Sequence, residues 1–312
     1  MKTEQTVRHY RIRARQIIKR VEHDIGSNQP TLYELAQWLV ENQPVMSKST
    51  WRQYRAALIC FFADEVNQSA DGQRAIALLR ATDTRQCKSH GTQTSAKKLK
   101  KISLADLEKL VVYFLVRENI RYGTETLAWL LSGLWTGLRP AEWQSAQFVK
   151  NNDGEWALYV QNGKNSNGRS HGNRRIVELS NMNEGELGVI HLHLLNIATS
   201  RNEGVNFVTF YNRCRDCLYG ANLKIWPNRS KLVSLYSARH QFAADAKCCG
   251  LTQTDIAALM GHASIETAGI HYGRRVSGRG GLKVSAHPGD VETVRALNVD
   301  RRKPESSGLG LG

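Results

Sequence analysis

Residues 124–142 read TETLAWLLSGLWTGLRPAE, and this stretch carries most of the information about the fold of the second half of the chain. Its first fourteen residues are nearly apolar all round, which predicts a helix that is buried on every side. The helix is expected to end at Gly137, and Arg139 and Glu142 follow at once. An arginine at the end of an apolar helix is costly unless it has a partner or a ligand. A purely structural ion pair between Arg139 and Glu142 and a site for an anion explain this pattern equally well.

The charge of the chain is strongly positive. Its 312 residues include 43 Lys and Arg against 28 Asp and Glu, which is a formal net charge of +15. Hydrophobic residues make up 41% and charged residues 23%, which is typical of a globular protein and excludes a disordered or fibrous chain. The length predicts two domains. A protein this basic is expected to bind a polyanion, and nucleic acid is the first candidate.

No segment predicts secretion or a membrane span. The longest nearly apolar stretch, 127–138, is interrupted by Ser132, Gly133 and Thr136 and is too short to cross a bilayer. The basic N-terminus leads into RHYRIRARQIIKR and not into the apolar core of a signal peptide. The six cysteines are therefore expected to be reduced thiols in the cytosol. The predicted location is cytoplasmic, in association with the nucleoid.

Residues 1–84 are predicted to form a helical domain. Apolar residues recur at helical spacing in four segments, 6–25, 31–42, 49–67 and 71–81, and basic residues lie on the outer faces. Four short amphipathic helices of this kind can pack into a small bundle.

A basic linker, 85–101, is predicted to connect this bundle to a second domain, 102–275, which a C-terminal tail, 276–312, follows. The linker has few apolar residues and several Ser, Thr, Gly and Lys. The second domain is predicted to be mainly helical. Short strands are predicted at 146–150, 156–161 and 174–179.

Three further spots carry residue types that suit a phosphate ligand. Lys164 lies in the polar loop NGKNSNGRSHGN between two predicted strands. Arg239 and His240 lie in YSARH at the first turn of a predicted helix, where the helix dipole adds to their positive field. In MGHASIETAGIHY, His262 opens a segment and Tyr272 closes it. Taken singly, each spot also has an ordinary explanation: an exposed basic turn, a helix end and a half-buried tyrosine.

Taken together and in this order, the four motifs resemble those of the tyrosine recombinase (phage integrase) family. The resemblance rests on TGLRPAE, the hairpin lysine, Y-x-x-R-H where H-x-x-R-H is usual, and MGHASIETAGIHY. It covers about 103–275, and the helix STWRQYRAAL resembles the core-binding domain of that family. It implies a mainly α fold with a small β-sheet: a helical, SAM-like core-binding domain and a mixed α/β catalytic domain that close as a C-shaped clamp around duplex DNA.

The resemblance implies a site-specific recombinase that cuts and rejoins DNA through a 3′-phosphotyrosyl intermediate. The guanidinium forks of Arg139 and Arg239 suit the oxygens of a pentacoordinate phosphate, and His262 donates a further hydrogen bond to them. Tyr272 is the implied nucleophile, and Lys164 is the implied general acid for the leaving 5′ oxygen. No metal, ATP or other cofactor is expected, because side chains supply the cations and the covalent link conserves the bond energy.

The implied supporting residues are Glu142 and His240, which orient neighbouring groups. Tyr236 stands where the family has histidine, and its phenol either hydrogen-bonds the phosphate or only packs. Tyr272 follows His262 by ten residues where nine is usual, and one residue rotates a helical position by about 100°. DNA contacts are predicted for basic residues whose alternative is a solvated surface: Lys48, Arg52, Arg55, Lys97, Lys98, Arg169, Arg174, Arg175 and Arg274.

The resemblance also implies partners. Four protomers on two double-stranded recombination sites would exchange strands in pairs through a Holliday junction, to integrate, excise or resolve a mobile element. An accessory DNA-bending or directionality protein is a further expected partner, and DVETVRAL in the tail is the candidate for docking on a neighbouring protomer. Two alternatives stay open. One is an architectural DNA-binding protein on the same fold without cleavage activity. The other is a type IB topoisomerase or telomere resolvase, against which the short, two-domain chain argues.

Overall fold

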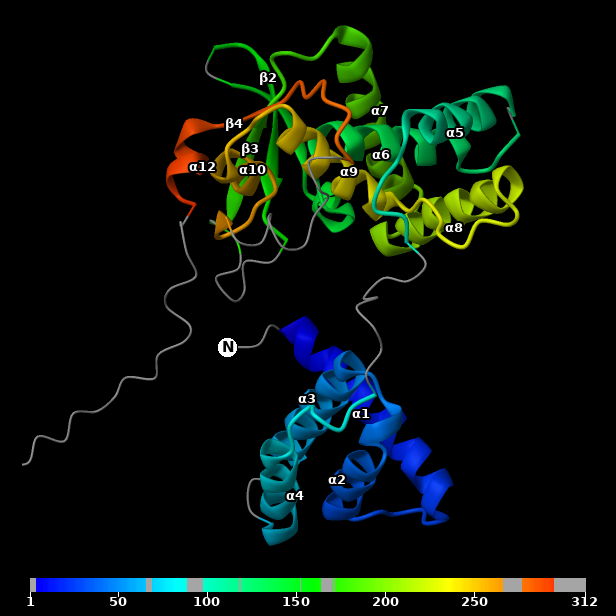
Figure 1. Cartoon of the computed structure of the whole chain (residues 1–312), viewed down its shortest axis with the longest axis vertical. Helices are drawn as coiled ribbons and strands as arrows, with labels where there is room; N and C mark the ends of the chain where they lie inside the picture. The colour runs from blue at the N-terminus through cyan, green and yellow to red at the C-terminus, as the bar shows by residue number, and fades with distance from the viewer. Residues whose placement is uncertain are drawn as a thin grey trace, which may run out of the picture. The chain divides into compact units, whose positions relative to one another are not determined.

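The computed structural model describes residues 4–65, 69–88, 98–117, 119–151, 153–163, 170, 172–265 and 277–294. Contacts divide the chain into two compact units, 1–94 and 95–312 (Figure 1). The division falls inside the basic segment 85–101. Each unit has its own hydrophobic core. Among the described residues, no helix combines the length and the hydropathy that a bilayer crossing requires.

The first unit consists of helices that pack in pairs. Its elements are α1 (Glu4–Ile25), α2 (Leu32–Glu41), the 3₁₀ turn η1 (Gln43–Val45), α3 (Lys48–Glu65) and α4 (Ala70–Ala81). The α1 helix packs against α3, and α2 packs against α4. Trp51, Leu58 and Phe62 of α3 are fully buried in the core of the unit. Thr31 and Glu34 form a capping box that satisfies free backbone N–H groups at the start of α2.

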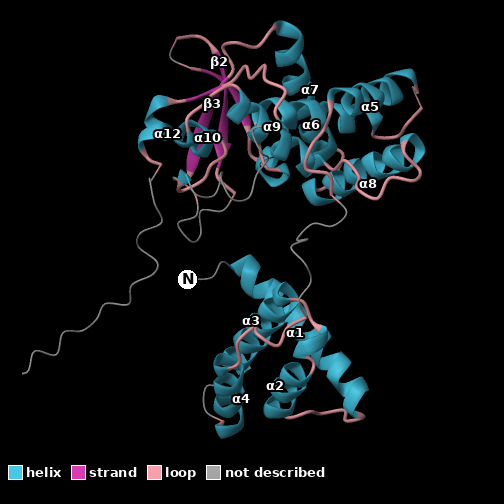
Figure 2. Ribbon diagram, viewed as in Figure 1, coloured by secondary structure: helices cyan, strands magenta, loops and turns pink. Residues whose placement is uncertain are grey.

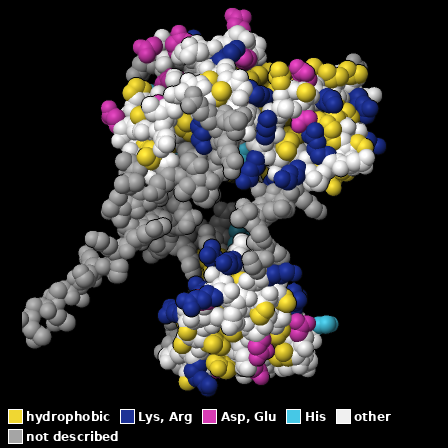
Figure 3. Space-filling view, viewed as in Figure 1, with side chains coloured by type: hydrophobic (Ala, Val, Ile, Leu, Met, Phe, Trp, Pro, Cys, Tyr) yellow, Lys and Arg dark blue, Asp and Glu magenta, His cyan; other side chains and the backbone are white. Residues whose placement is uncertain are grey.

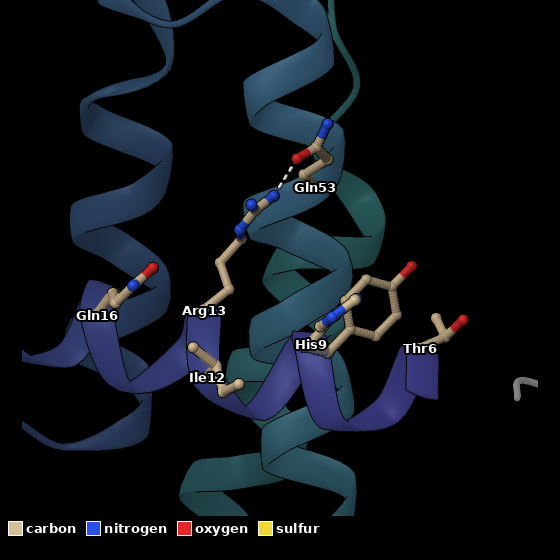
Figure 4. Close-up of a pocket in the computed structure, with 7 residues that line it drawn as sticks. Thr6, His9, Ile12, Arg13, Gln16 and Gln53 are labelled. Carbon is tan, nitrogen blue, oxygen red and sulfur yellow. Dashed lines mark hydrogen bonds between the residues drawn. The ribbon is translucent and has the colours of Figure 1, made fainter. Parts of the chain in front are cut away.

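A pocket of about 480 Å³ lies against α1 and α3 of the first unit (Figure 4). It is lined by Thr6, His9, Tyr10, Ile12, Arg13, Gln16 and Gln53. The Arg13 guanidinium donates a hydrogen bond to the Gln53 side-chain oxygen and so links the two helices. This contact fixes part of the basic face of α1 on α3.

The second unit combines a small sheet with helices (Figure 2). Its helical elements are α5 (Leu104–Val116), α6 (Gly123–Thr136), the 3₁₀ turn η2 (Pro140–Gln144), α7 (Glu184–Asn202), α8 (Phe207–Ile225), α9 (Leu235–Cys248), α10 (Gln253–Leu259) and α12 (Pro288–Glu292). Its strands are β1 (Gln147–Lys150), β2 (Trp156–Gln161), β3 (Arg174–Glu178) and β4 (Ser285–Ala286). The predicted fold class, mainly α with a small sheet, is confirmed.

The α6 helix is the centre of the second unit. It packs against α7, α8 and α9, and its residues are buried on most sides, as its apolar sequence predicts. In Figure 1, α6 and α9 lie between the sheet and the pair α5 and α8. Gly137 ends α6 in the left-handed conformation, with φ +68°, and the ring of Phe242 in α9 lies directly against it. This turn determines where the chain goes next.

The sheet is antiparallel in the order β1-β2-β3-β4. The β2 and β3 strands pair with Val160 opposite Arg175, and β4 pairs with the other edge of β3. The sequence predicts a separate tail from residue 276, but the described part, 277–294, is built into the second unit. Asp290 accepts the backbone N–H of Ile176 at 2.7 Å, and Val284 is buried in the core. The free edge of β3 explains this packing, because its backbone groups need partners.

Replacing Gly137 by Ala is expected to destabilise the second unit. A Cβ atom there would lie 2.2 Å from Cδ1 of Phe242, on a backbone that L residues rarely adopt. We expect a loss of about 3 kcal/mol in the free energy of unfolding, measured by urea denaturation. Gly204→Ala is the matched control, because Gly204 has φ +79° and a Cβ atom there would meet nothing within 4 Å. Its expected loss is about 1 kcal/mol, and equal losses would contradict this account.

Candidate active site

Arg139 takes its place from the end of α6. After Gly137 the chain turns into η2, and Pro140 occupies the first position of that turn. The Arg139 backbone N–H donates to Oε2 of Glu142 at 2.8 Å, and its Nη1 donates to Oε1 at 2.5 Å. Only 7% of Arg139 and 1% of Glu142 is exposed. The ion pair, one of the two alternatives that the sequence leaves open, therefore exists, and it is buried.

Glu142 is shared by three guanidinium groups. Arg175 Nη2 donates to Oε2 at 2.7 Å, and Arg239 Nη1 lies 3.8 Å from the same oxygen. Burial alone would raise the pKa of Glu142, but the charges of Arg175, Arg239 and Arg139 outweigh it and hold the pKa well below its usual value. The carboxylate is therefore ionised, and the cluster keeps a surplus of positive charge.

Arg239 connects this cluster to the end of α6 and to the turn that follows α10. It lies on α9 with no exposed surface, and its Nη1 donates to the Gly137 carbonyl at 2.6 Å. Its Nη2 lies 2.6 Å from the Met260 carbonyl and 3.1 Å from Nε2 of His262. Burial, together with the charges of Arg239 and its neighbours, lowers the pKa of His262. The imidazole is therefore neutral, with Nε2 accepting from Arg239 and the proton on Nδ1.

The prediction that Arg175 binds DNA is wrong. Its side chain has no exposed surface, and besides Glu142 it donates from Nε to the Leu259 carbonyl at 2.8 Å and from Nη1 to the Asn162 side chain. The reason is strand alternation: Arg175 shares a face with the buried Val177, whereas Arg174 is exposed. That period of two in RRIVE was the signal that could have revealed the buried arginine.

Gly261 is required by this packing. It has φ +61°, and a Cβ atom there would lie 2.5 Å from Oδ1 of Asn162 and 2.7 Å from Nη1 of Arg175. Asn162 also holds the neck of the β2–β3 hairpin, since its Nδ2 donates to the Gly172 carbonyl at 3.0 Å. Sequence reasoning missed the role of Asn162, because nothing in a polar loop distinguishes one asparagine from the next.

Tyr236 and His240 lie one helical turn apart on α9. Their rings pack edge to face with centroids 5.3 Å apart. Burial lowers the pKa of His240 to about 4, and the charges of Lys100, Arg239 and Lys98 add to this effect. His240 is thus neutral at pH 7. Tyr236, half-buried, precedes Arg239 by one turn and lines a pocket of about 520 Å³ together with Lys98.

The other predicted DNA contacts are distributed over the surface. Lys48, Arg52, Lys98 and Arg174 are exposed, whereas Arg55 is half-buried and donates to the Thr82 carbonyl at 2.8 Å. Figure 3 shows Lys and Arg side chains gathered at one end of the first unit and over the α5 and α8 side of the second.

Five predicted residues lie outside the described residues: Lys97, Lys164, Arg169, Tyr272 and Arg274. Within the described residues, no group of His, Cys, Asp or Glu could hold a metal ion.

Replacing Glu142 by Gln is expected to reduce the free energy of unfolding at neutral pH by about 3 kcal/mol, because three guanidinium groups would lose their shared counterion. The folded pKa is depressed, so this stabilisation is present above the unfolded pKa of about 4.3 and is lost as the pH falls toward the folded value. The difference between wild type and variant should therefore shrink as the pH falls from about 5 to about 3 in urea unfolding.

The matched control is Glu178→Gln on β3. That carboxylate is half-buried and accepts a hydrogen bond from the Asn151 amide at 3.1 Å. Its loss should cost under about 1 kcal/mol. A difference between Glu142→Gln and wild type that does not change with pH would contradict the ionised state of Glu142.

Comparisons with known proteins agree with the fold described above. No protein-family model matches the chain, and no curated protein matches it. Among solved structures, a lambda integrase dimer bound to a COC' core site superposes with a TM-score of 0.50 at 15% identity, covering 86% of this chain and 88% of that one. XerH recombinase bound to difH superposes with a TM-score of 0.46 at 18% identity, covering 78% of this chain and 69% of that one. Tn1549 integrase on transposon right end DNA superposes with a TM-score of 0.46 at 14% identity, covering 86% of this chain and 88% of that one. The match to lambda integrase shows that the chain has the tyrosine recombinase fold.

Proposed function

We propose that this chain is a site-specific DNA recombinase that breaks and rejoins strands through a tyrosine. The observation that carries the proposal is the buried cluster of Arg139, Arg175 and Arg239 around one carboxylate, with a neutral His262 beside it. Such a cluster keeps a net positive charge in surroundings of low dielectric constant, where it attracts an anion strongly. A phosphodiester is the anion that a basic DNA-binding protein meets.

Within this cluster the roles differ. Arg139 is the arginine with the most exposure, so it is our candidate for direct contact with the phosphate. Arg239 is already bonded to the Gly137 and Met260 carbonyls, and these bonds fix its guanidinium before DNA binds. Preorganised donors of this kind need no rearrangement as negative charge develops in the transition state. The neutral His262 would add a hydrogen bond from Nδ1.

Tyr272 and Lys164 complete the proposed chemistry. The phenolic oxygen of Tyr272 forms a bond to phosphorus as the bond from phosphorus to the 5′ oxygen breaks. The phenol loses its proton to solvent, and the 5′ oxygen receives one from the Lys164 ammonium group. Rejoining is the same reaction in reverse, with the 5′ hydroxyl of the exchanged strand as the nucleophile. Tyr236 would assist from the first turn of α9.

Exposed cations on both units would hold the duplex through its backbone. Lys48 and Arg52 lie together on α3, and Arg174 lies on β3 with its guanidinium over the Tyr159 ring at 5.2 Å. We further propose that four protomers act on two sites through a Holliday junction, since each strand exchange needs two cleaved phosphates. The lambda integrase that shares this fold was solved as a dimer on a core site, which supports DNA as the ligand.

A covalent adduct tests the proposal. The protein first selects its binding site from a randomised pool of duplex DNA. That site, nicked near the scissile position so that the cleaved end diffuses away, is then incubated with the protein in EDTA. We expect an adduct that survives denaturing electrophoresis, because the phosphotyrosyl bond is trapped. Tyr272→Phe should abolish it, and the matched control His271→Ala should retain it. Binding without any adduct would favour the architectural alternative, and an adduct in Tyr272→Phe would exclude Tyr272 as the nucleophile.

Cations proposed to act in catalysis and cations proposed to bind DNA should affect different measured quantities. Arg139→Ala is expected to slow single-turnover cleavage by about 100-fold or more, because a preorganised donor to the transition state is lost. Lys48→Ala and Arg52→Ala should each lower the slope of log affinity against log salt by about 0.9, without slowing cleavage at saturating protein. Fluorescence anisotropy at several salt concentrations measures the slope. Identical behaviour of the two kinds of variant would contradict this division.

A further inference from the structure

Three arginines lie on two tyrosine rings near the start of α6. Cζ of Arg117 lies 4.6 Å from the centroid of the Tyr113 ring. Cζ of Arg121 and Cζ of Arg213 each lie 5.5 Å from the centroid of the Tyr122 ring. Tyr113 belongs to α5, Arg213 belongs to α8, and Tyr122 precedes the first residue of α6. We call these five residues the α5–α6 patch.

The turn that carries the patch is strained at Tyr122. This residue has φ +65° and ψ +18°, and in the part of the chain that the structure describes no other residue except glycine has a positive φ. Glycine would adopt this conformation without strain, but it has no side chain to offer. The Tyr122 hydroxyl accepts a hydrogen bond from Arg213 Nη1 at 2.6 Å, and the ring packs edge to face on Phe210. The strained residue therefore places an aromatic ring beneath two guanidinium groups.

The positive charge of the patch is not neutralised. Among the described residues, no carboxylate forms an ion pair with Arg117, Arg121 or Arg213, whereas the nearby Arg215 pairs with Asp216 at 2.8 Å. Arg117 and Arg121 are exposed, and Figure 3 shows Lys and Arg side chains over this side of the second unit. A cation–π contact occupies the face of a guanidinium group, so its N–H donors remain available to an anion.

A chain of phosphates is the partner that this patch fits. A guanidinium group donates in pairs to phosphate oxygens, and a DNA strand presents one phosphate about every 3.4 Å along its axis. Neighbouring guanidinium groups can therefore each meet a phosphate of one strand. The formal net charge of +15 favours the same partner, because it attracts a polyanion over the whole chain.

The patch and the proposed phosphate site lie at opposite ends of α6. This helix begins at Gly123, directly after Tyr122, and ends at Thr136, three residues before Arg139. Its 14 residues give a rise of about 20 Å, which is the rise of about six base pairs of duplex DNA. The patch and Arg139 are therefore too far apart to hold the same phosphate.

We propose that the α5–α6 patch is a second phosphate-binding surface, which holds a DNA backbone about 20 Å from the phosphate at Arg139. This inference rests on the proposed function, because the candidate active site supplies the first phosphate. The second backbone belongs to the same duplex, about six base pairs from the first phosphate, or to a second duplex. In both cases the patch contacts phosphates and carries no base specificity.

The salt dependence of binding tests this surface. The DNA is a duplex that carries the site selected from the randomised pool and extends well beyond it on both sides. In fluorescence anisotropy, the double variant Arg117→Ala/Arg121→Ala should lower the slope of log affinity against log salt by about 1.8, which is about 0.9 for each phosphate contact. Arg117→Lys/Arg121→Lys keeps the charge and should keep the slope. Arg215→Ala is the matched control: this exposed arginine is already paired with Asp216, so the slope should not change.

A second measurement identifies the duplex that the patch holds. Protein saturated with the selected duplex is mixed with a labelled second duplex, and complexes that contain both are captured. A lower slope on the single duplex assigns the contact to that duplex. An unchanged slope, with capture of the second duplex reduced about 10-fold or more in the Arg117→Ala/Arg121→Ala variant, assigns it to the second duplex, because hydrogen bonds between charged groups are lost.

Behaviour of Arg117→Ala/Arg121→Ala identical to that of Arg215→Ala in both measurements would overturn the inference. Retention on immobilised polyglutamate that depends on Arg117 and Arg121 would then assign the patch to an acidic protein partner. Both side chains are exposed, so the double variant should unfold at the same urea concentration as wild type. Wild-type protein that binds DNA without forming a covalent adduct would contradict the proposed function, and the slope and capture measurements would still decide the role of the patch.

Discussion

The carboxylate of Glu142 is the constraint on which the second unit depends. Arg139, Arg175 and Arg239 would repel one another in a buried site without it, and each reaches it from a different element: the end of α6, β3 and α9. One carboxylate thereby links the sheet to the helices α6 and α9. The same arrangement leaves a surplus of positive charge at the place where a phosphate would bind. The stability of this unit and its proposed function therefore rest on the same ion pairs, so a substitution that changes one is expected to change the other.

Around this cluster the backbone packs so tightly at three glycines that a Cβ atom would clash. Gly137 turns the chain against Phe242, Gly261 turns it against Asn162 and Arg175, and Gly278 lies on α9. At each point a side chain would push apart elements that carry the cations. The glycines of TGLRP and MGH thus belong to the site as much as the charged residues do, because they permit the spacing that the ion pairs require.

Much of the fold and the site could be predicted from the sequence, for identifiable reasons. The helical spacing of apolar residues indicated the helices of the first unit, and the almost wholly apolar sequence of α6 indicated that this helix is buried. Motif order brought Arg139, Glu142, Arg239 and His262 together, as the structure does. Arg175 was predicted to be exposed because arginine is charged, although the alternation of RRIVE places it on the same face as the buried Val177. The packing of 277–294 on its own unit was missed because a segment rich in Gly and Arg carries no periodic signal.

The sequence by itself determined the chemical inventory: a basic two-domain chain, its helices, and cations spaced as in tyrosine recombinases. These are local properties, readable from residue types and spacing. Only the tertiary structure decided which cations are buried around Glu142 and which face solvent, because burial depends on contacts between residues far apart in the chain. It also decided that residues 277–279 lie against α9. A hydrogen bond between Gln241 and Ser277 leaves no trace in the local sequence of either residue.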